Sequence, residues 1–244
     1  MAQYSDFARV YDTFMNNIPY EEWAMLVANK LKEYNGGRKV LELGCGTGTF
    51  SFLMEKKGYE VVGIDCAPDM VKEAIKKAKK NKSTCKFELQ DMRVIEQEEL
   101  FDSVISVCDS INYLSEEFDL QSTFDGVFNV LKDGGIFMFD MKTEEFYKSL
   151  GENIFVDENE EGCYIWKNFY NEETRDNSYE LTFFIKKKKD LYTKVCEEHV
   201  QHVFYEEEIL RCAKNAGFVL KEKFGDGEAK QREYYIFERK YEDE

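Results

Sequence analysis

A glycine-rich turn between an apolar run and a helix-forming run restricts the fold of this chain more than any other feature. Residues 40–50 read VLELGCGTGTF, with glycines at positions 44, 46 and 48. The pattern predicts a buried strand at Lys39–Leu43 and a helix from about Thr47 to Lys57. Three glycines weaken helices and strands, so we interpret the turn as a place where bare backbone meets a ligand.

The strand and helix pattern then repeats along the chain. Further strands are predicted at Glu60–Asp65, Lys86–Leu89, Asp102–Cys108, Gly135–Asp140, Phe218–Phe224 and Glu233–Arg239. Helices are predicted from Pro68 to about Lys80, at Glu116–Leu131 and from about Tyr205 to Asn215. Strands that alternate with helices imply right-handed crossovers and a mainly parallel sheet, which binds ligands at the carboxyl ends of its strands.

The pattern changes after about residue 150. Aromatic and β-branched residues dominate Cys163–Tyr170, Tyr179–Lys187 and Leu191–Phe204, and turn-prone residues separate these stretches. We therefore expect an antiparallel β-meander over residues 149–204, inserted as a lid into an α/β domain formed by residues 38–148 and 205–244. Residues 1–37 are expected to form an N-terminal helical cap.

Composition restricts the partners. The chain has 33 Lys and Arg against 49 Asp and Glu, a net charge of -16 that repels phosphate backbones and anionic lipids. Neither a nucleic acid nor a membrane partner is expected, since the chain also shows no signal peptide and no long apolar run. The seven scattered cysteines form no C-x-x-C pair, which favours reduced thiols in a cytoplasmic protein and no metal site.

The spacing and charge of the turn indicate the kind of ligand. The glycines do not match the dinucleotide pattern G-x-G-x-x-G, and no G-K-[ST] follows as in a phosphate-binding loop. Glu42 would repel a pyrophosphate but suits a ligand with an ammonium or a sulfonium. Asp65 ends the second strand, where a carboxylate can accept hydrogen bonds from both hydroxyls of a ribose. The expected ligand is an adenosine-like nucleoside without phosphates.

With these residues the chain resembles the class I S-adenosylmethionine-dependent methyltransferases over most of residues 39–140. The resemblance implies an α/β fold with a Rossmann-like, mainly parallel seven-stranded sheet and helices on both faces. It implies S-adenosyl-L-methionine as the cofactor, with the methionine part wrapped by the turn and the ribose held by Asp65. The turn residues are Glu42, Gly44, Cys45, Gly46 and Gly48, the residues at the adenine are Cys66, Met70, Asp91 and Met92, and Cys108 faces the methionine end.

The segment YSDFARVYDTFM and the expected meander are similar to the small-molecule branch of that family, which includes glycine N-methyltransferases and amino-sugar N,N-dimethyltransferases. The branch implies an aromatic N-terminal segment over the cofactor, with Tyr4 or Tyr11 near the methionine carboxylate or sulfonium. It also implies a lid over the acceptor. Ordinary packing is the alternative role for both tyrosines.

Tyr11, Asp109, Tyr113 and His199 are the candidate catalytic residues. Asp109 or His199 could take a proton from an amine acceptor. His199 and His202 lie three apart on a predicted strand, so they should point to opposite faces, and we favour the face of His199 and Gln201 for the pocket. Helix capping and core packing are the alternative roles of Asp109 and Tyr113.

These features predict a methyltransferase that acts on a small-molecule acceptor at nitrogen or oxygen. The alternatives are a methyltransferase acting on RNA or a protein side chain, and a non-catalytic protein that binds S-adenosylmethionine. The spacing and charge of the turn disfavour a nicotinamide-dependent dehydrogenase. The sequence leaves the acceptor and the oligomeric state open.

Overall fold

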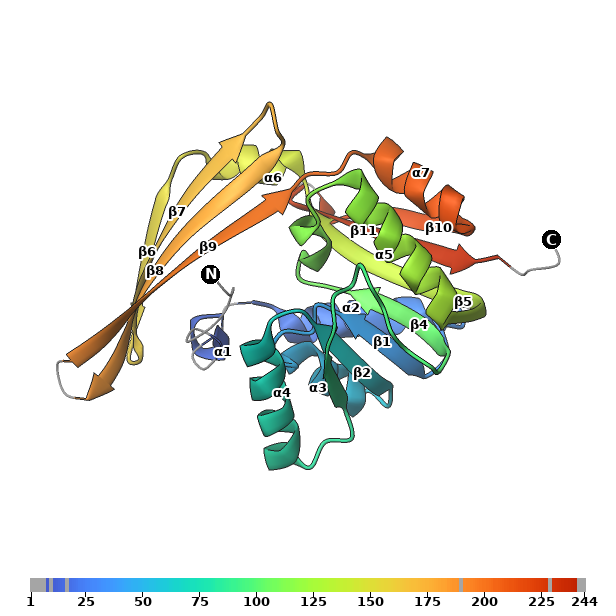
Figure 1. Cartoon of the computed structure of the whole chain (residues 1–244), viewed down its shortest axis with the longest axis horizontal. Coiled ribbons are helices and arrows are strands. Elements are labelled where there is room, and N and C mark those ends of the chain that lie inside the picture. Colours follow the sequence, from blue (N-terminus) through green and yellow to red (C-terminus); the bar gives the residue numbers. More distant parts are fainter. Residues whose placement is uncertain (1–7, 9–10, 16–17, 189–190, 228–229, 241–244) are drawn as a thin grey trace.

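Seven strands form one sheet in the order β10-β11-β5-β4-β1-β2-β3 (Figure 1). The computed structural model describes residues 8, 11–15, 18–188, 191–227 and 230–240. The strands are β1 (Lys39–Leu43), β2 (Glu60–Asp65), β3 (Lys86–Leu89), β4 (Phe101–Ser106), β5 (Leu131–Lys142), β10 (Phe218–Gly225) and β11 (Arg232–Arg239). β1 to β5 pair in parallel, and β11 is antiparallel to both β5 and β10. The predicted Rossmann-like, mainly parallel seven-stranded sheet is confirmed.

Helices cover both faces of this sheet because its buried strands carry apolar residues on both sides. Leu41 packs on one face with α5 (Glu117–Val130) and α7 (Glu206–Ala216). Its neighbour Val40 packs on the other, with α2, α3 and α4. These three helices span Tyr20–Glu33, Thr49–Lys56 and Pro68–Asn81. Alternate residues of the central strands therefore belong to two separate cores.

The order of the strands reverses between β1 and β4, which pair directly. The glycine turn follows β1, and the short 3-10 helix η2 (Ser110–Tyr113) follows β4. In an open α/β sheet the crevice at such a point binds ligands. The turn ends later than predicted, since Gly48 has the left-handed φ of +78° and α3 begins only at Thr49.

A second, antiparallel sheet consists of β6 (Ile154–Asn159), β7 (Gly162–Asn171), β8 (Asp176–Lys188) and β9 (Leu191–His202), in that order. We call it the antiparallel sheet. Figure 1 shows it arching away from the seven-stranded sheet, with α1 (Tyr11–Phe14) beneath it. The sequence predicted three of these strands. It missed β6, an edge strand with mostly exposed residues, and α6 (Glu144–Leu150), which is too short for a clear helical period.

Phe124 is the centre of the core under α5. It is fully buried, and its ring lies 5.3 Å from that of Phe137 and 5.6 Å from that of Phe237. We predict that Phe124→Ala lowers the free energy of unfolding by about 3–5 kcal/mol, because the lost contacts leave a cavity. Urea unfolding measures this. Phe118→Ala, on the same helix but 77% exposed, is the control and should change stability little.

Candidate active site

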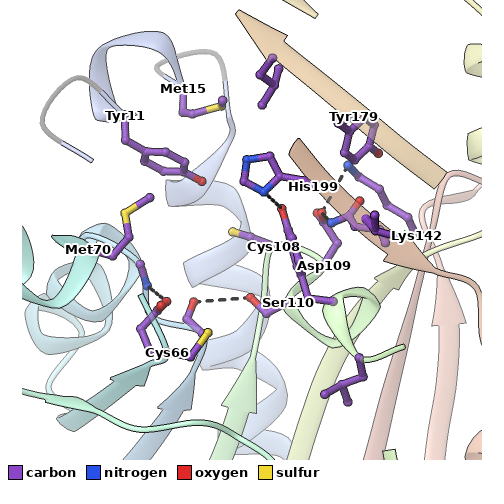
Figure 2. Close-up of a pocket in the computed structure, with 18 of the residues that line it drawn as sticks. Tyr11, Met15, Cys66, Met70, Cys108, Asp109, Ser110, Lys142, Tyr179 and His199 are labelled. Carbon is purple, nitrogen blue, oxygen red and sulfur yellow. Dashed lines mark hydrogen bonds and ion pairs between the residues drawn. The ribbon is translucent and has the colours of Figure 1, made fainter. Parts of the chain in front are cut away.

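A cavity of about 620 Å³ lies between the carboxyl edge of the seven-stranded sheet, the antiparallel sheet and α1 (Figure 2). Most of the residues singled out from the sequence border it, although they come from distant parts of the chain. They are Tyr11, Gly44, Gly46, Asp65, Cys66, Met70, Asp91, Met92, Cys108, Asp109, Tyr113 and His199. The strand order thus gathers both predicted groups, those for the cofactor and those for catalysis, around one space.

Glu42 and Cys45 border a smaller cavity of about 40 Å³ that shares Tyr11, Gly44, Gly46 and Cys108 with the larger one. Gly48 borders neither cavity. A Cβ at Gly48 would lie 2.6 Å from the ring of Phe87, so this glycine lets α3 pack closely against β3. The structure thus shows a packing role for Gly48, and its ligand contact stays a prediction. Tyr4 lies outside the described residues.

Gly44 and Gly46 present bare backbone to the cavity. Both have left-handed φ angles, +69° and +53°. A Cβ at Gly44 would clash with Ser110, whereas one at Gly46 would point into open space with no atom within 4 Å. The amide of Gly46 donates to Asp65 Oδ2 at 2.8 Å, and the amide of Ala67 donates to Oδ1 at 2.8 Å. Asp65 thus fixes the backbone of the turn, while the space beside Gly46 stays open. This arrangement suits a ligand that lies against the backbone of the turn.

Glu42 is a buried carboxyl group beneath this turn. It is 1% exposed and accepts a hydrogen bond from the hydroxyl of Ser51. Burial raises the pKa of Glu42 to about 8, although the Ser51 hydroxyl acts in the opposite direction. A cation in the smaller cavity would compensate the negative charge of the Glu42 carboxylate. It would therefore favour ionisation of Glu42 despite the burial.

Asp91 lines the cavity, as do Cys66 and Met70, which lie on the side opposite the antiparallel sheet (Figure 2). Arg93 Nη2 lies 2.6 Å from Asp91 Oδ2, and this hydrogen-bonded guanidinium lowers the pKa of Asp91. An ionised, oriented carboxylate is available there as a hydrogen-bond acceptor.

Asp109 joins three elements by its carboxylate. Oδ1 accepts from Arg232 Nη2 at 2.8 Å, and Oδ2 accepts from Gln201 Nε2 at 2.7 Å. Lys142 Nζ lies 3.3 Å from Oδ2 (Figure 2). Burial alone would raise the pKa of Asp109, but the charges of Lys142 and Arg232 lower it. A carboxylate beside two cations is a weak proton acceptor, and the catalytic role of Asp109 stays a prediction.

Lys142 and Arg232 line the cavity, and the sequence reasoning missed both. Lys142 is the last residue of β5, and Arg232 is the first residue of the antiparallel β11, so both lie at the carboxyl edge of the sheet. Lys142 could have been found as a charge just after a predicted strand. Arg232 could not have been found in this way, because the local sequence does not show that β11 runs antiparallel to β5.

The backbone at the end of β4 is strained. Cys108 and Asp109 both have positive φ, +61° and +55°, although neither is glycine. Residues held in this region cost about 1–3 kcal/mol each and gather at functional sites. The conformation directs Cys108 and Asp109 to the cavity.

His199 lines the cavity from β9 in the antiparallel sheet, and it lies between Glu197 and Tyr113. Its Nε2 is 3.2 Å from Glu197 Oε2, and its Nδ1 is 3.5 Å from the hydroxyl of Tyr113. His202 also borders the cavity, so the expectation that only one histidine would do so is wrong. The reason is that β9 ends at His202, where the strict alternation of faces no longer holds.

α1 connects the two sides of the cavity. Asp12 accepts a hydrogen bond from the Thr47 hydroxyl at 2.6 Å and pairs with Lys77 at 2.6 Å, next to the glycine turn. On the other side, the ring of Phe14 lies 5.5 Å from that of Phe183 in the antiparallel sheet. The segment thus closes the space between turn and sheet.

Comparisons with known proteins agree with this geometry. A family model described as a methyltransferase domain matches residues 35–240. A crystal structure of an S-adenosylmethionine-dependent methyltransferase from Clostridium acetobutylicum ATCC 824 superposes with a TM-score of 0.85 at 26% identity, covering 98% of this chain and 99% of that one. This chain belongs to the S-adenosylmethionine-dependent methyltransferases.

Two relatives in sequence extend the comparison. YqeM of Bacillus subtilis (strain 168), whose name assigns it provisionally to the methyltransferases, is 35% identical over 219 residues, 89% of this chain and 87% of its own length. A glycine/sarcosine N-methyltransferase of Parasynechococcus marenigrum (strain WH8102) is 31% identical over 112 residues, 45% of this chain and 39% of its own length. The methyltransferase is thus similar to YqeM over most of its length and to the N-methyltransferase over less than half.

The cofactor of this methyltransferase is S-adenosyl-L-methionine, and the residues present suit it. The open backbone at Gly46 and the buried carboxyl of Glu42 would hold the methionine part. Asp65 and Asp91 offer carboxylates for the nucleoside. In the described ranges, none of the helices combines the length and apolar character that crossing a bilayer requires.

We predict that the stability of the cofactor-free methyltransferase falls as pH rises because of Glu42. Its folded-state pKa of about 8 lies above the ordinary 4.5, so the folded protein holds a proton that the unfolded chain has lost. Between these values the unfolding free energy should decrease by about 1.4 kcal/mol per pH unit from this group.

Urea unfolding at several pH values between about 5.5 and 7 measures this slope. Glu42→Gln, which resembles the protonated acid, should remove that part of the pH dependence and be the more stable protein at the upper end. Equal slopes in the two proteins would contradict the assignment.

Proposed function

We propose that this methyltransferase transfers the methyl group of S-adenosylmethionine to nitrogen or oxygen of a small molecule held inside the cavity. The observation that carries the proposal is that residues of the antiparallel sheet and α1 line the cavity opposite the cofactor residues (Figure 2). A cavity lined from both sides can align two small reactants, which is the main demand of methyl transfer.

The wall beyond the cofactor residues favours an acceptor with an apolar part. Side chains from two strands of the antiparallel sheet line it, namely Tyr164, Trp166, Tyr179, Leu181 and Phe183. A long nucleic acid would also meet a net charge of -16. The N-methyltransferase relative acts, by its name, on glycine and sarcosine, which supports a small amine as one acceptor class.

The cofactor supplies an activated methyl group, and the chain positions the acceptor and removes its proton. We assign proton removal to His199, which faces the cavity with Tyr113. Tyr11, half-buried where the two cavities meet, would orient the groups that react. Asp109 would hold Lys142, Arg232 and Gln201 in place as a positioning residue.

Asp65→Ala should weaken S-adenosylmethionine binding about tenfold to a hundredfold, because hydrogen bonds to a charged acceptor are worth about 1.5–3 kcal/mol. Titration calorimetry measures it, and circular dichroism checks that the fold is retained. Asp69→Ala, four residues along the chain and outside the cavity lining, is the matched control. Unchanged affinity in Asp65→Ala would remove the ribose assignment.

The proposed function is tested by binding and turnover together. We expect titration calorimetry to show binding of S-adenosylmethionine and S-adenosylhomocysteine, but not of NAD. Formation of S-adenosylhomocysteine is then followed with separate panels of small amines, small hydroxyl compounds, total RNA and an unfractionated protein mixture. Turnover should occur with a small molecule. Turnover only with RNA or protein, or binding without turnover in any panel, would contradict the proposal.

A further inference from the structure

Glu197 is a buried acid that lies next to His199 on β9. The two residues are two positions apart, so their side chains lie on the same face of the strand. Both side chains are almost inaccessible, 3% exposed for Glu197 and 2% for His199. Their contact joins Oε2 to Nε2 at 3.2 Å. A carboxylate buried against an imidazole restricts which ring nitrogen carries the hydrogen.

The two nitrogens of His199 have different partners. A carboxylate can only accept, so in the arrangement that we infer below Nε2 carries the hydrogen and donates it to Glu197. The lone pair of Nδ1 is then directed to the hydroxyl of Tyr113, which lies at 3.5 Å. Tyr113 borders the cavity, whereas Glu197 is not among the described residues that line it. The basic nitrogen is therefore the one on the cavity side.

We propose that Glu197 is a positioning residue that holds His199 with Nδ1 as the base, which implies an acceptor whose nucleophilic atom carries a hydrogen. This rests on the proposed function and narrows its substrate to compounds with an N–H or O–H group at the reacting atom. An acceptor that is already an anion would gain nothing from such a pair.

The proposed reaction moves one proton and one methyl group. The N–H or O–H bond of the acceptor breaks, and its hydrogen reaches His199 Nδ1 by way of the Tyr113 hydroxyl. The electron pair of the nucleophile forms the new bond to the methyl carbon, and the bond from that carbon to sulfur breaks with its pair left on sulfur. The positive charge passes from the sulfonium to the imidazolium, where the Glu197 carboxylate compensates it.

Other ionisable groups among the described residues near His199 belong to neighbouring strands. Its cross-strand neighbour is Tyr179 on β8. Asp109 and Lys142 lie beyond Gln201, two residues along the strand.

The second histidine, His202, offers a control because the other nitrogen of its ring contacts a carboxylate. His202 contacts a carboxylate through its other nitrogen, since its Nδ1 lies 2.7 Å from Asp176 Oδ1. The chain has two histidines in all, so their imidazole signals can be separated by single substitutions. We therefore expect the two rings to carry their hydrogens on different nitrogens, Nε2 in His199 and Nδ1 in His202.

Nuclear magnetic resonance of the full chain labelled with ¹⁵N-histidine tests this without any acceptor. Spectra are taken at a pH where both rings prove to be neutral. Glu197→Gln should move the Nε2–H proton of His199 upfield, since the bond to a carboxylate is lost, and leave His202 unchanged. Asp176→Asn should do the reverse. The unchanged ring in each variant also reports that the fold is intact, and Glu197→Asp replaces Glu197→Gln if the latter does not fold.

A His199 ring with its hydrogen on Nδ1 in the unsubstituted protein, or a His199 signal that does not respond to Glu197→Gln, would overturn the proposal. With an acceptor in hand, Glu197→Gln should lower kcat by a part of the roughly 10²–10⁴-fold contribution of a general base, with KM and cofactor affinity unchanged. An unchanged kcat would also overturn it. Lack of turnover with every acceptor would instead count against the proposed function, because the spectra do not depend on activity.

Discussion

The carboxylate of Asp109 is the interaction on which the acceptor side of the site depends. It lies just after β4 and binds Arg232 of β11, Lys142 of β5 and Gln201 of β9. The first two strands belong to the seven-stranded sheet and the third to the antiparallel sheet. One buried anion thus ties the two sheets together at the edge where the cavity lies. Its two cations make ionisation favourable despite burial, so the contact persists across the neutral pH range.

The site has two halves with different chemistry. Toward β2 and β3, bare backbone and the acids Asp65 and Asp91 suit a nucleoside. Toward the antiparallel sheet, aromatic rings surround the pair of His199 and Tyr113. α1 touches both halves through Asp12 and Phe14.

The fold and the cofactor side could be predicted from the sequence because their signals are local. Lys39–Leu43 and the glycines after it form one continuous stretch, and Asp65 ends the next strand. The packing of Gly48 against Phe87 could not be predicted, since the two residues are distant in sequence. Asp109 borders the cavity, as expected. Its contacts with Lys142 and Arg232 could not be predicted, because these residues lie 33 and 123 positions away in the sequence.

The sequence by itself determined that the chain forms a mainly parallel α/β sheet with a glycine turn after β1, and that it resembles the S-adenosylmethionine-dependent methyltransferases. Hydrophobic period, turn residues and the spacing of Glu42, the glycines and Asp65 are properties of neighbouring residues, and they keep their meaning without the rest of the chain. The tertiary structure alone decided which cations contact Asp109 and which side chains contact the two nitrogens of His199. Those outcomes depend on the direction of β11 and on the register of β9 against β8, which bring together charges that no local pattern connects.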